Sequence, residues 1–308
     1  MERNDVSDGS LDMQEETLDD RIIALKTRAA DDYSQACLEG ARRALTDHDN
    51  PLRLNFFATA MRILFEHMME TLAPNDDVAR TSWFKPEQKS GKPTRGQRVV
   101  YAIQGGLTET FVTQELRVDP RPLRKRLLEA FDACSNRVHE REHNVIADPG
   151  EQDAVAEAIL AALASLFDAI RDCRAAVVEP IAETLDEAAV DALLSETILE
   201  VDELATHHSI QEVYVDKTIV HAIGPDTITY RSTGSVDVIL QFGSNSDIRN
   251  DMGAEIEQSF PFACDIEVPL SEPWNLEWAE PRYGVDVSKW RDAMRPDDFE
   301  PDGINSDD

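Results

Sequence analysis

The stretch ATHHSIQEVYVDK, from Ala205 to Lys217, decides the fold because the spacing of apolar residues changes within it. Before this stretch, apolar residues recur every three or four positions, as on one face of an α-helix. After it they alternate with polar residues, as at Val213 and Val215, which is typical of a strand with one face toward water. The change predicts an α+β protein in which an N-terminal helical bundle precedes a small antiparallel β-meander.

The helical part is expected to cover residues 1–208. One apolar stripe runs from Leu18 to Ala36, and a second helix is predicted to begin at Asn50 and Pro51, an N-cap residue followed by a good first helical residue. The longest stripe, from Glu151 to Val178, alternates threes and fours and predicts a helix that packs along most of its length. We expect these helices to form one bundle.

The sheet part is expected to cover residues 209–270. Two short turns are predicted, at residues 224–226 and at Ser232-Thr233-Gly234, so that three strands precede a long final one. The remainder, residues 271–308, is rich in Pro and Asp, and we expect an acidic tail that is disordered from about residue 295.

Composition limits the classes of partner. The chain has 61 acidic residues against 30 basic ones and a formal charge of −31, which repels nucleic acid and anionic membranes unless positive charge is concentrated somewhere. Its most apolar run, residues 154–170, contains two acidic residues and is too short to span a bilayer, so we expect no membrane contact. The four cysteines are far apart and occupy apolar positions, which indicates reduced core residues of a cytoplasmic protein.

Positive charge is concentrated in residues 80–126, which hold eleven basic residues and four acidic ones. Such a segment is able to contact the phosphate backbone of a nucleic acid. The alternative is that these charges pair with the acidic helices around them. The residues proposed to contact nucleic acid are Lys85, Lys89, Lys92, Arg95, Arg98, Arg124, Lys125 and Arg126.

A candidate catalytic pair lies in the segment SNRVHEREH, from Ser135 to His143. Arg137 and His143 have five residues between them, a spacing that resembles the Arg-x(4–6)-His motif of the all-helical HEPN ribonucleases, which cut RNA without metal. A histidine can move the proton of a 2′-hydroxyl while an arginine steadies the phosphate. His139 is an alternative partner for Arg137, and a solvated, charged helix end is the alternative to any catalytic role.

Other sites are not indicated by the sequence. His207 and His208 are adjacent, so in a strand they point to opposite faces, and we expect them to mark the start of the sheet and not a shared site. The sequence has no phosphate-binding glycine loop, no GxSxG and no HExxH, and we expect neither a metal site nor a cofactor.

Several blocks together resemble one family. ATHHSIQEVYVDK, TGSVDVILQFGSNSD and SFPFACDIEV, with NPLRLNFFATAMRILFEHMMETLAP and SWFKPE upstream, are similar to the predicted pPIWI-associating nucleases of bacterial conflict systems. The resemblance implies a nucleic-acid-directed role in defence against mobile elements or phage, beside a protein partner of such a system. We therefore expect a nuclease that favours RNA and acts through the Arg/His pair. The alternative is a non-catalytic adaptor or regulatory module, and the oligomeric state stays open.

Overall fold

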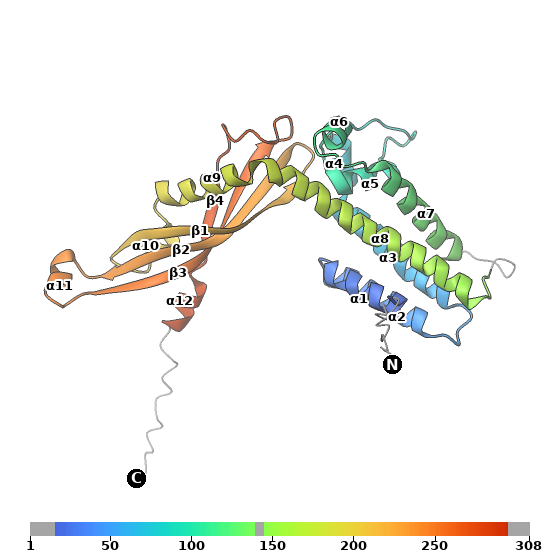
Figure 1. Cartoon of the computed structure of the whole chain (residues 1–308), viewed down its shortest axis with the longest axis horizontal. Coiled ribbons are helices and arrows are strands. Elements are labelled where there is room, and N and C mark those ends of the chain that lie inside the picture. The colour runs from blue at the N-terminus through green and yellow to red at the C-terminus, as the bar shows by residue number, and fades with distance from the viewer. Residues whose placement is uncertain (1–15, 139–144, 295–308) are drawn as a thin grey trace, which may run out of the picture. The chain divides into compact units, whose positions relative to one another are not determined.

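The computed structural model describes residues 16–138 and 145–294. The chain divides into two compact units, residues 1–173 and 174–308. The predicted fold class is confirmed, since helices precede a four-stranded antiparallel sheet (Figure 1). The tail expected to be disordered from about residue 295 lies outside the described residues. Of the segment 271–294, part is structured and joins the sheet.

The first unit is helical. In chain order its helices are α1 (Leu18–Arg28), α2 (Asp32–Thr46), α3 (Arg53–Leu72), α4 (Asn75–Arg80), α5 (Arg95–Gln104), α6 (Glu109–Gln114), α7 (Arg121–Val138) and α8 (Pro149–Val178), the last of which ends in the second unit. Helix α3 supplies much of the core, because Phe57, Met61 and Phe65 are fully buried. The ring of Phe65 lies 4.5 Å from that of Phe131 on α7, so the apolar face of α3 packs against α7 through aromatic contact.

The stripe from Leu18 to Ala36, predicted as one helix, is divided between α1 and α2. Asp31 is the N-cap of α2 and its carboxylate accepts hydrogen bonds from the backbone N–H and the hydroxyl of Ser34. Ile22 is buried on the predicted stripe, whereas Tyr33 is exposed. The spacing of apolar residues thus continues across the break between α1 and α2, and in the sequence only the N-cap residue Asp31 marks that break.

The second unit contains the sheet. Its elements are η2 (Glu179–Ile181), α9 (Ala182–Ser195), α10 (Leu199–Asp202), β1 (His207–Ile223), β2 (Thr227–Phe242), α11 (Asn245–Arg249), β3 (Ala254–Pro269), β4 (Arg282–Val285) and α12 (Ser288–Ala293). The strands lie in the order β1-β2-β3-β4, all antiparallel. Residues 182–202, which the sequence pattern assigns to the bundle, belong to this unit, and α9 contacts all four strands.

One face of the sheet is buried and the other is polar. Val236, Phe262 and Ile266 belong to the buried face. On this side, the hydroxyl of Thr218 donates to the carboxylate of Asp186 on α9 over 2.6 Å and lies 2.7 Å from the hydroxyl of Ser232, which is fully buried. These bonds satisfy the buried hydroxyls and hold α9 on the sheet.

The turn predicted at Ser232-Thr233-Gly234 does not exist, because β2 runs unbroken through it. Gly234 has no positive φ, but a Cβ there would clash with the carbonyl oxygen of Tyr214 on β1. The glycine permits close approach of two strands beside a register shift between Val215 and Lys217. A real turn follows β2, where Gly243 has φ 102°.

Candidate functional site

The segment with concentrated positive charge is held in place by two contacts at the first turn of α5. The side-chain amide of Gln97 donates to the carbonyl oxygen of Lys85 over 2.8 Å, which fixes the loop that precedes the helix. A Cβ on Gly96 would lie 2.6 Å from the Nε atom of Arg124, so the glycine lets the α7 guanidinium lie against α5. Lys85, Arg95 and Arg124 therefore lie around one helix end. We name these three residues, together with Lys89 and Lys92 before α5 and Lys125 and Arg126 on α7, the basic surface.

The charges of this surface are not paired. Among the described residues, Lys85, Lys89, Lys92, Arg95, Arg124 and Arg126 form no ion pair with a carboxylate. Lys125 has only a distant partner, with its Nζ 3.9 Å from Glu129 Oε1 and both side chains exposed. Such an exposed pair contributes little. For most of the predicted contact residues, the structure thus favours a solvated positive surface over pairing with neighbouring acidic helices.

Arg98 differs from the other predicted contact residues. Its Nε donates to the carbonyl oxygen of Ala73 over 2.9 Å, at the C-terminal end of α3. Burial lowers the pKa of the Arg98 guanidinium, and nearby Glu70 opposes this effect. Arg98 therefore has a structural role in joining α5 to α3, and it is not part of the basic surface.

The helix ends beneath these cations have an unusual charge distribution. Neither α5 nor α7 has an acidic residue in its first turn, and each begins with an arginine, Arg95 and Arg121. The free N–H groups of a helix N-terminus carry a partial positive charge, so acidic residues are normally favoured there. The guanidinium of Arg121 is neutralised by Asp119, but that of Arg95 lies 5.5 Å over the ring of Phe131 without an acidic partner among the described residues. The side chain of Thr94 already accepts from the N–H of Gln97, but the positive end of α5 and the guanidinium of Arg95 together are suited to an anion.

The predicted catalytic pair is only partly described. Arg137 lies in the last turn of α7, and its carbonyl oxygen accepts a hydrogen bond of 2.8 Å from the amide of Asn55. His143 and the alternative His139 lie outside the described residues. The pairing of Arg137 with either histidine stays a prediction.

A second Arg/His pair, which the sequence analysis missed, is present at the start of α3. The side chain of Arg53 is 3% exposed, and its guanidinium donates over 2.7 Å to Gln152, 2.8 Å to Asp153, 3.1 Å to the carbonyl oxygen of Leu45 and 3.2 Å to that of Pro149. The ends of α2, α3 and α8 are thereby joined. A search for arginine followed by histidine does not find this pair, because here the histidine comes first.

His48 is the histidine of this pair. Its Nδ1 lies 2.9 Å from Nη1 of Arg53, and since a guanidinium only donates, Nδ1 must accept. The proton of the neutral imidazole is then on Nε2, and His48 is exposed. A cavity of about 310 Å³ lies beside it, lined by Arg42, His48, Arg53 and Asp153 among others. In this arrangement Nδ1 of His48 is occupied by Arg53 and Nε2 can only donate a hydrogen bond. His48 is therefore better suited to binding a ligand than to abstracting a proton from one.

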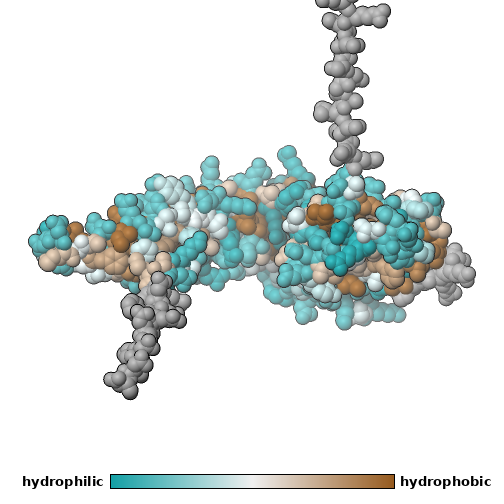
Figure 2. All heavy atoms as spheres, turned by 90° about the horizontal axis from the view of Figure 1, so that it is seen from below, coloured by the Kyte–Doolittle hydropathy of each residue, from teal (hydrophilic) through white to brown (hydrophobic). Residues whose placement is uncertain are grey.

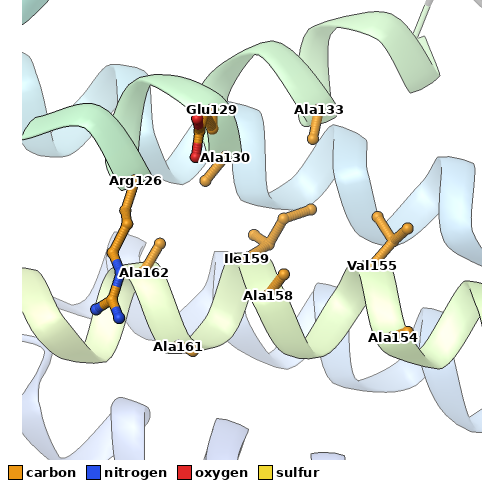
Figure 3. A pocket seen from close by; sticks show the side chains of 10 residues that line it. All are labelled: Arg126, Glu129, Ala130, Ala133, Ala154, Val155, Ala158, Ile159, Ala161 and Ala162. Atoms are coloured by element: carbon orange, nitrogen blue, oxygen red, sulfur yellow. The ribbon is translucent and has the colours of Figure 1, made fainter. Parts of the chain in front are cut away.

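A larger cavity of about 590 Å³ lies between α7 and α8 (Figure 3). Alanines, Val155 and Ile159 line most of it, and the side chain of Arg126 reaches from α7 toward Ala162 of α8. Apart from Arg126 and Glu129 its lining is apolar. It has no histidine or nucleophile and is suited to an apolar or aromatic group.

The adjacent histidines at the start of β1 lie apart, and the cysteines Cys134 and Cys264 are buried. His208 Nδ1 lies 3.3 Å from Asp202, while His207 is exposed, so the two do not share a site. Burial raises the pKa of Cys134 to about 12 and that of Cys264 to about 11, which keeps both thiols protonated. Among residues 16–138 and 145–294, no group of three His, Cys, Asp or Glu side chains is placed to hold a metal ion, and no helix is long and apolar enough to cross a membrane.

The comparisons with known proteins give one consistent result. Two family models, both described as predicted pPIWI-associating nuclease, match the chain over residues 26–163 and 170–291. No curated protein and no solved structure matches it.

Proposed function

The chain belongs to the predicted pPIWI-associating nucleases, and from this we propose that it binds RNA and cleaves it in a prokaryotic system of defence against mobile elements. The observation that supports the nucleic-acid role most directly is the basic surface. An otherwise acidic chain places unpaired cations at the N-terminal end of α5, where helix dipole and side chains attract the same phosphate. The acidic remainder restricts nucleic acid to that face.

The proposed chemistry is metal-independent transesterification. His143 accepts the proton of a ribose 2′-hydroxyl, the oxygen attacks the adjacent phosphorus, and the bond to the 5′-oxygen breaks. The products are a 2′,3′-cyclic phosphate and a 5′-hydroxyl, the latter protonated by an acid. Arg137 stabilises the charge on the phosphate. DNA lacks the 2′-hydroxyl and would not be cut by this route.

A cleavage assay tests the proposal. RNA, single-stranded DNA and double-stranded DNA are each incubated with the full chain, in EDTA and in Mg²⁺ or Mn²⁺, beside His143→Ala and His139→Ala. His48→Gln is the matched control, since it changes another histidine beside an arginine in the same unit. Cleavage of RNA in EDTA that is lost only in His143→Ala is the expected result, with a cyclic phosphate on the product.

Each other outcome has a defined meaning. Loss in His139→Ala instead transfers the proton-accepting role to that residue, and loss in His48→Gln moves the site to the cavity beside Arg53. Cleavage that requires metal, or that is equal on DNA, contradicts the proposed mechanism. Binding of RNA without cleavage under every condition supports the second candidate, a non-catalytic adaptor, which the open sheet edge of the second unit favours independently.

A further inference from the structure

The two long edges of the sheet differ. Strand β1 forms one edge, and its pairing with β2 has register shifts after Ile210, Val215 and Val220. Such irregularities bend an edge strand and discourage the addition of another strand. Strand β3 forms most of the other edge, and its pairing with β2 is continuous from Ala254 to Pro269. Strand β4 pairs only with residues 262–265 of it, so residues 254–260 form a regular edge (Figure 1).

The backbone groups that face outward from this edge can be assigned. The N–H of Asp286, next to β4, donates to the carbonyl oxygen of Pro261 over 2.8 Å, so the main-chain groups of Pro261 face away from β2. In an antiparallel ladder without a bulge this orientation repeats at every second residue. Glu255, Glu257 and Ser259 therefore present their N–H and C=O groups outward. None of these groups has a hydrogen bond across the outer edge within the described part of the chain.

The side chains along this edge alternate in character. Glu255, Glu257 and Ser259 are exposed on the polar face, where Asp237 pairs in register with Ser259. Ile256 and Phe260 belong to the other face, and the ring of Phe260 packs edge-on against Trp290 at 6.4 Å. A strand added here would place alternate side chains beside carboxylates and beside apolar groups.

We propose that residues 254–260 of β3 bind an extended segment of a partner protein in which basic and apolar residues alternate. Main-chain hydrogen bonds to Glu255, Glu257 and Ser259 hold the segment, and its Lys or Arg side chains lie beside Glu255 and Glu257. This site is in a different unit from the basic surface and does not depend on cleavage activity.

Other occupants of the edge are disfavoured by charge. A second copy paired antiparallel about Glu257 would place Glu257 opposite Glu257, and like charges directly opposite destabilise a sheet. The two terminal stretches of the chain are acidic in sequence, with MERNDVSDGSLDMQEE at one end and RPDDFEPDGINSDD at the other, and are repelled in the same way. Nucleic acid is repelled as well.

A peptide-binding assay on the full chain tests this inference. The probe is a fluorescent peptide of alternating Lys and Val, and its control has the same composition with the lysines in one block, which preserves charge and removes the alternation. Anisotropy should show at least tenfold tighter binding of the alternating peptide. Equal binding of the two peptides would show a purely electrostatic contact and overturn the proposal.

Two variants locate the peptide. Ser259→Pro removes one outward N–H and adds a ring at the edge without changing charge, and we expect at least tenfold weaker binding. The double variant Glu255→Lys with Glu257→Lys should no longer bind the Lys/Val peptide and should instead bind an alternating Glu/Val peptide. Glu277→Lys with Glu280→Lys makes the same charge change elsewhere in this unit and should leave the preference unchanged. If Ser259→Pro does not fold, the charge exchange decides, and its absence contradicts the inference.

Discussion

At the scale of single residues, Arg53 is a buried cation whose hydrogen bonds offset the loss of its hydration and connect helix ends. Its guanidinium is removed from water, but donors on all three nitrogens have acceptors from two other helix ends and from His48. A buried charge is tolerated only with such complete pairing. The side chain of Arg53 therefore connects the start of α3 to the ends of α2 and α8.

Replacing this arginine should be costly. In Arg53→Met the carbonyl groups of Leu45 and Pro149 and the amide of Gln152 lose their donor, and we expect the free energy of unfolding to fall by about 3 kcal/mol. Arg43, whose side chain is 76% exposed, is the control, and Arg43→Met should change the free energy of unfolding by less than about 0.5 kcal/mol. Urea denaturation followed by circular dichroism gives both values. Similar small losses in the two variants would show that the hydrogen bonds of Arg53 contribute nothing net.

The residues of the candidate site were only partly predictable. Counting charges located the segment that carries the basic surface, because charge density is visible in sequence. That Arg98 binds the carbonyl oxygen of Ala73 while Arg124 lies against Gly96 depends on tertiary contacts, which no local pattern contains. His48 and Arg53 were missed because a spacing motif assumes one order of residues.

At the scale of elements, the change in hydrophobic period predicted correctly where helices give way to strands, whereas glycine did not predict correctly where a turn lies. The strand β1 begins at His207, within the quoted stretch, and the longest predicted helix corresponds to α8. The sequence pattern predicts a turn at Gly234, but this residue lies in the middle of β2. Glycine is required both where φ is positive and where two backbones approach closely, and sequence does not distinguish these needs.

The glycine interpretation can be measured. A methyl group at residue 234 would clash with the carbonyl oxygen of Tyr214, so Gly234→Ala should destabilise the sheet unit by about 1–3 kcal/mol through a forced backbone shift. In Gly284→Ala, on β4, the new methyl group meets nothing within 4 Å, and that variant is the control. Thermal unfolding monitored by tryptophan fluorescence compares the two. Equal melting temperatures would show that β1 is free to move away from β2 at this point.

At the scale of the whole molecule, the division of the chain appears in two independent ways. One family model ends at residue 163 and the other begins at residue 170, while the contacts divide the chain after residue 173. The basic surface is in the first unit and the open acidic edge in the second. The sequence placed its boundary later because α9 has the same helical period as the bundle, and periodicity does not tell which neighbour a helix packs on. Figure 2 shows hydrophilic side chains over much of the visible surface of both units.

The segregation of charge leads to a prediction about salt. RNA binding should weaken as salt increases, because each phosphate contact releases counterions, with a slope of about −0.7 in the log–log plot for each contact on a single strand. Changing Lys85, Lys89 and Lys92 together to Gln should make the slope less negative by about 2. Changing Lys26, Lys217 and Lys289 to Gln alters the net charge equally and should leave the slope as it is. An unchanged slope in the first variant would place the RNA elsewhere.

The hydrogen bonds of Arg53 also have a consequence for folding during synthesis. Its partners Gln152 and Asp153 are 99 and 100 residues further along the chain. A nascent polypeptide carries the charge of Arg53 long before the ribosome has released the groups that neutralise it. We therefore expect the hydrogen bonds from Arg53 to α8 to form only after α8 has emerged, so that this part of the packing is completed late in synthesis.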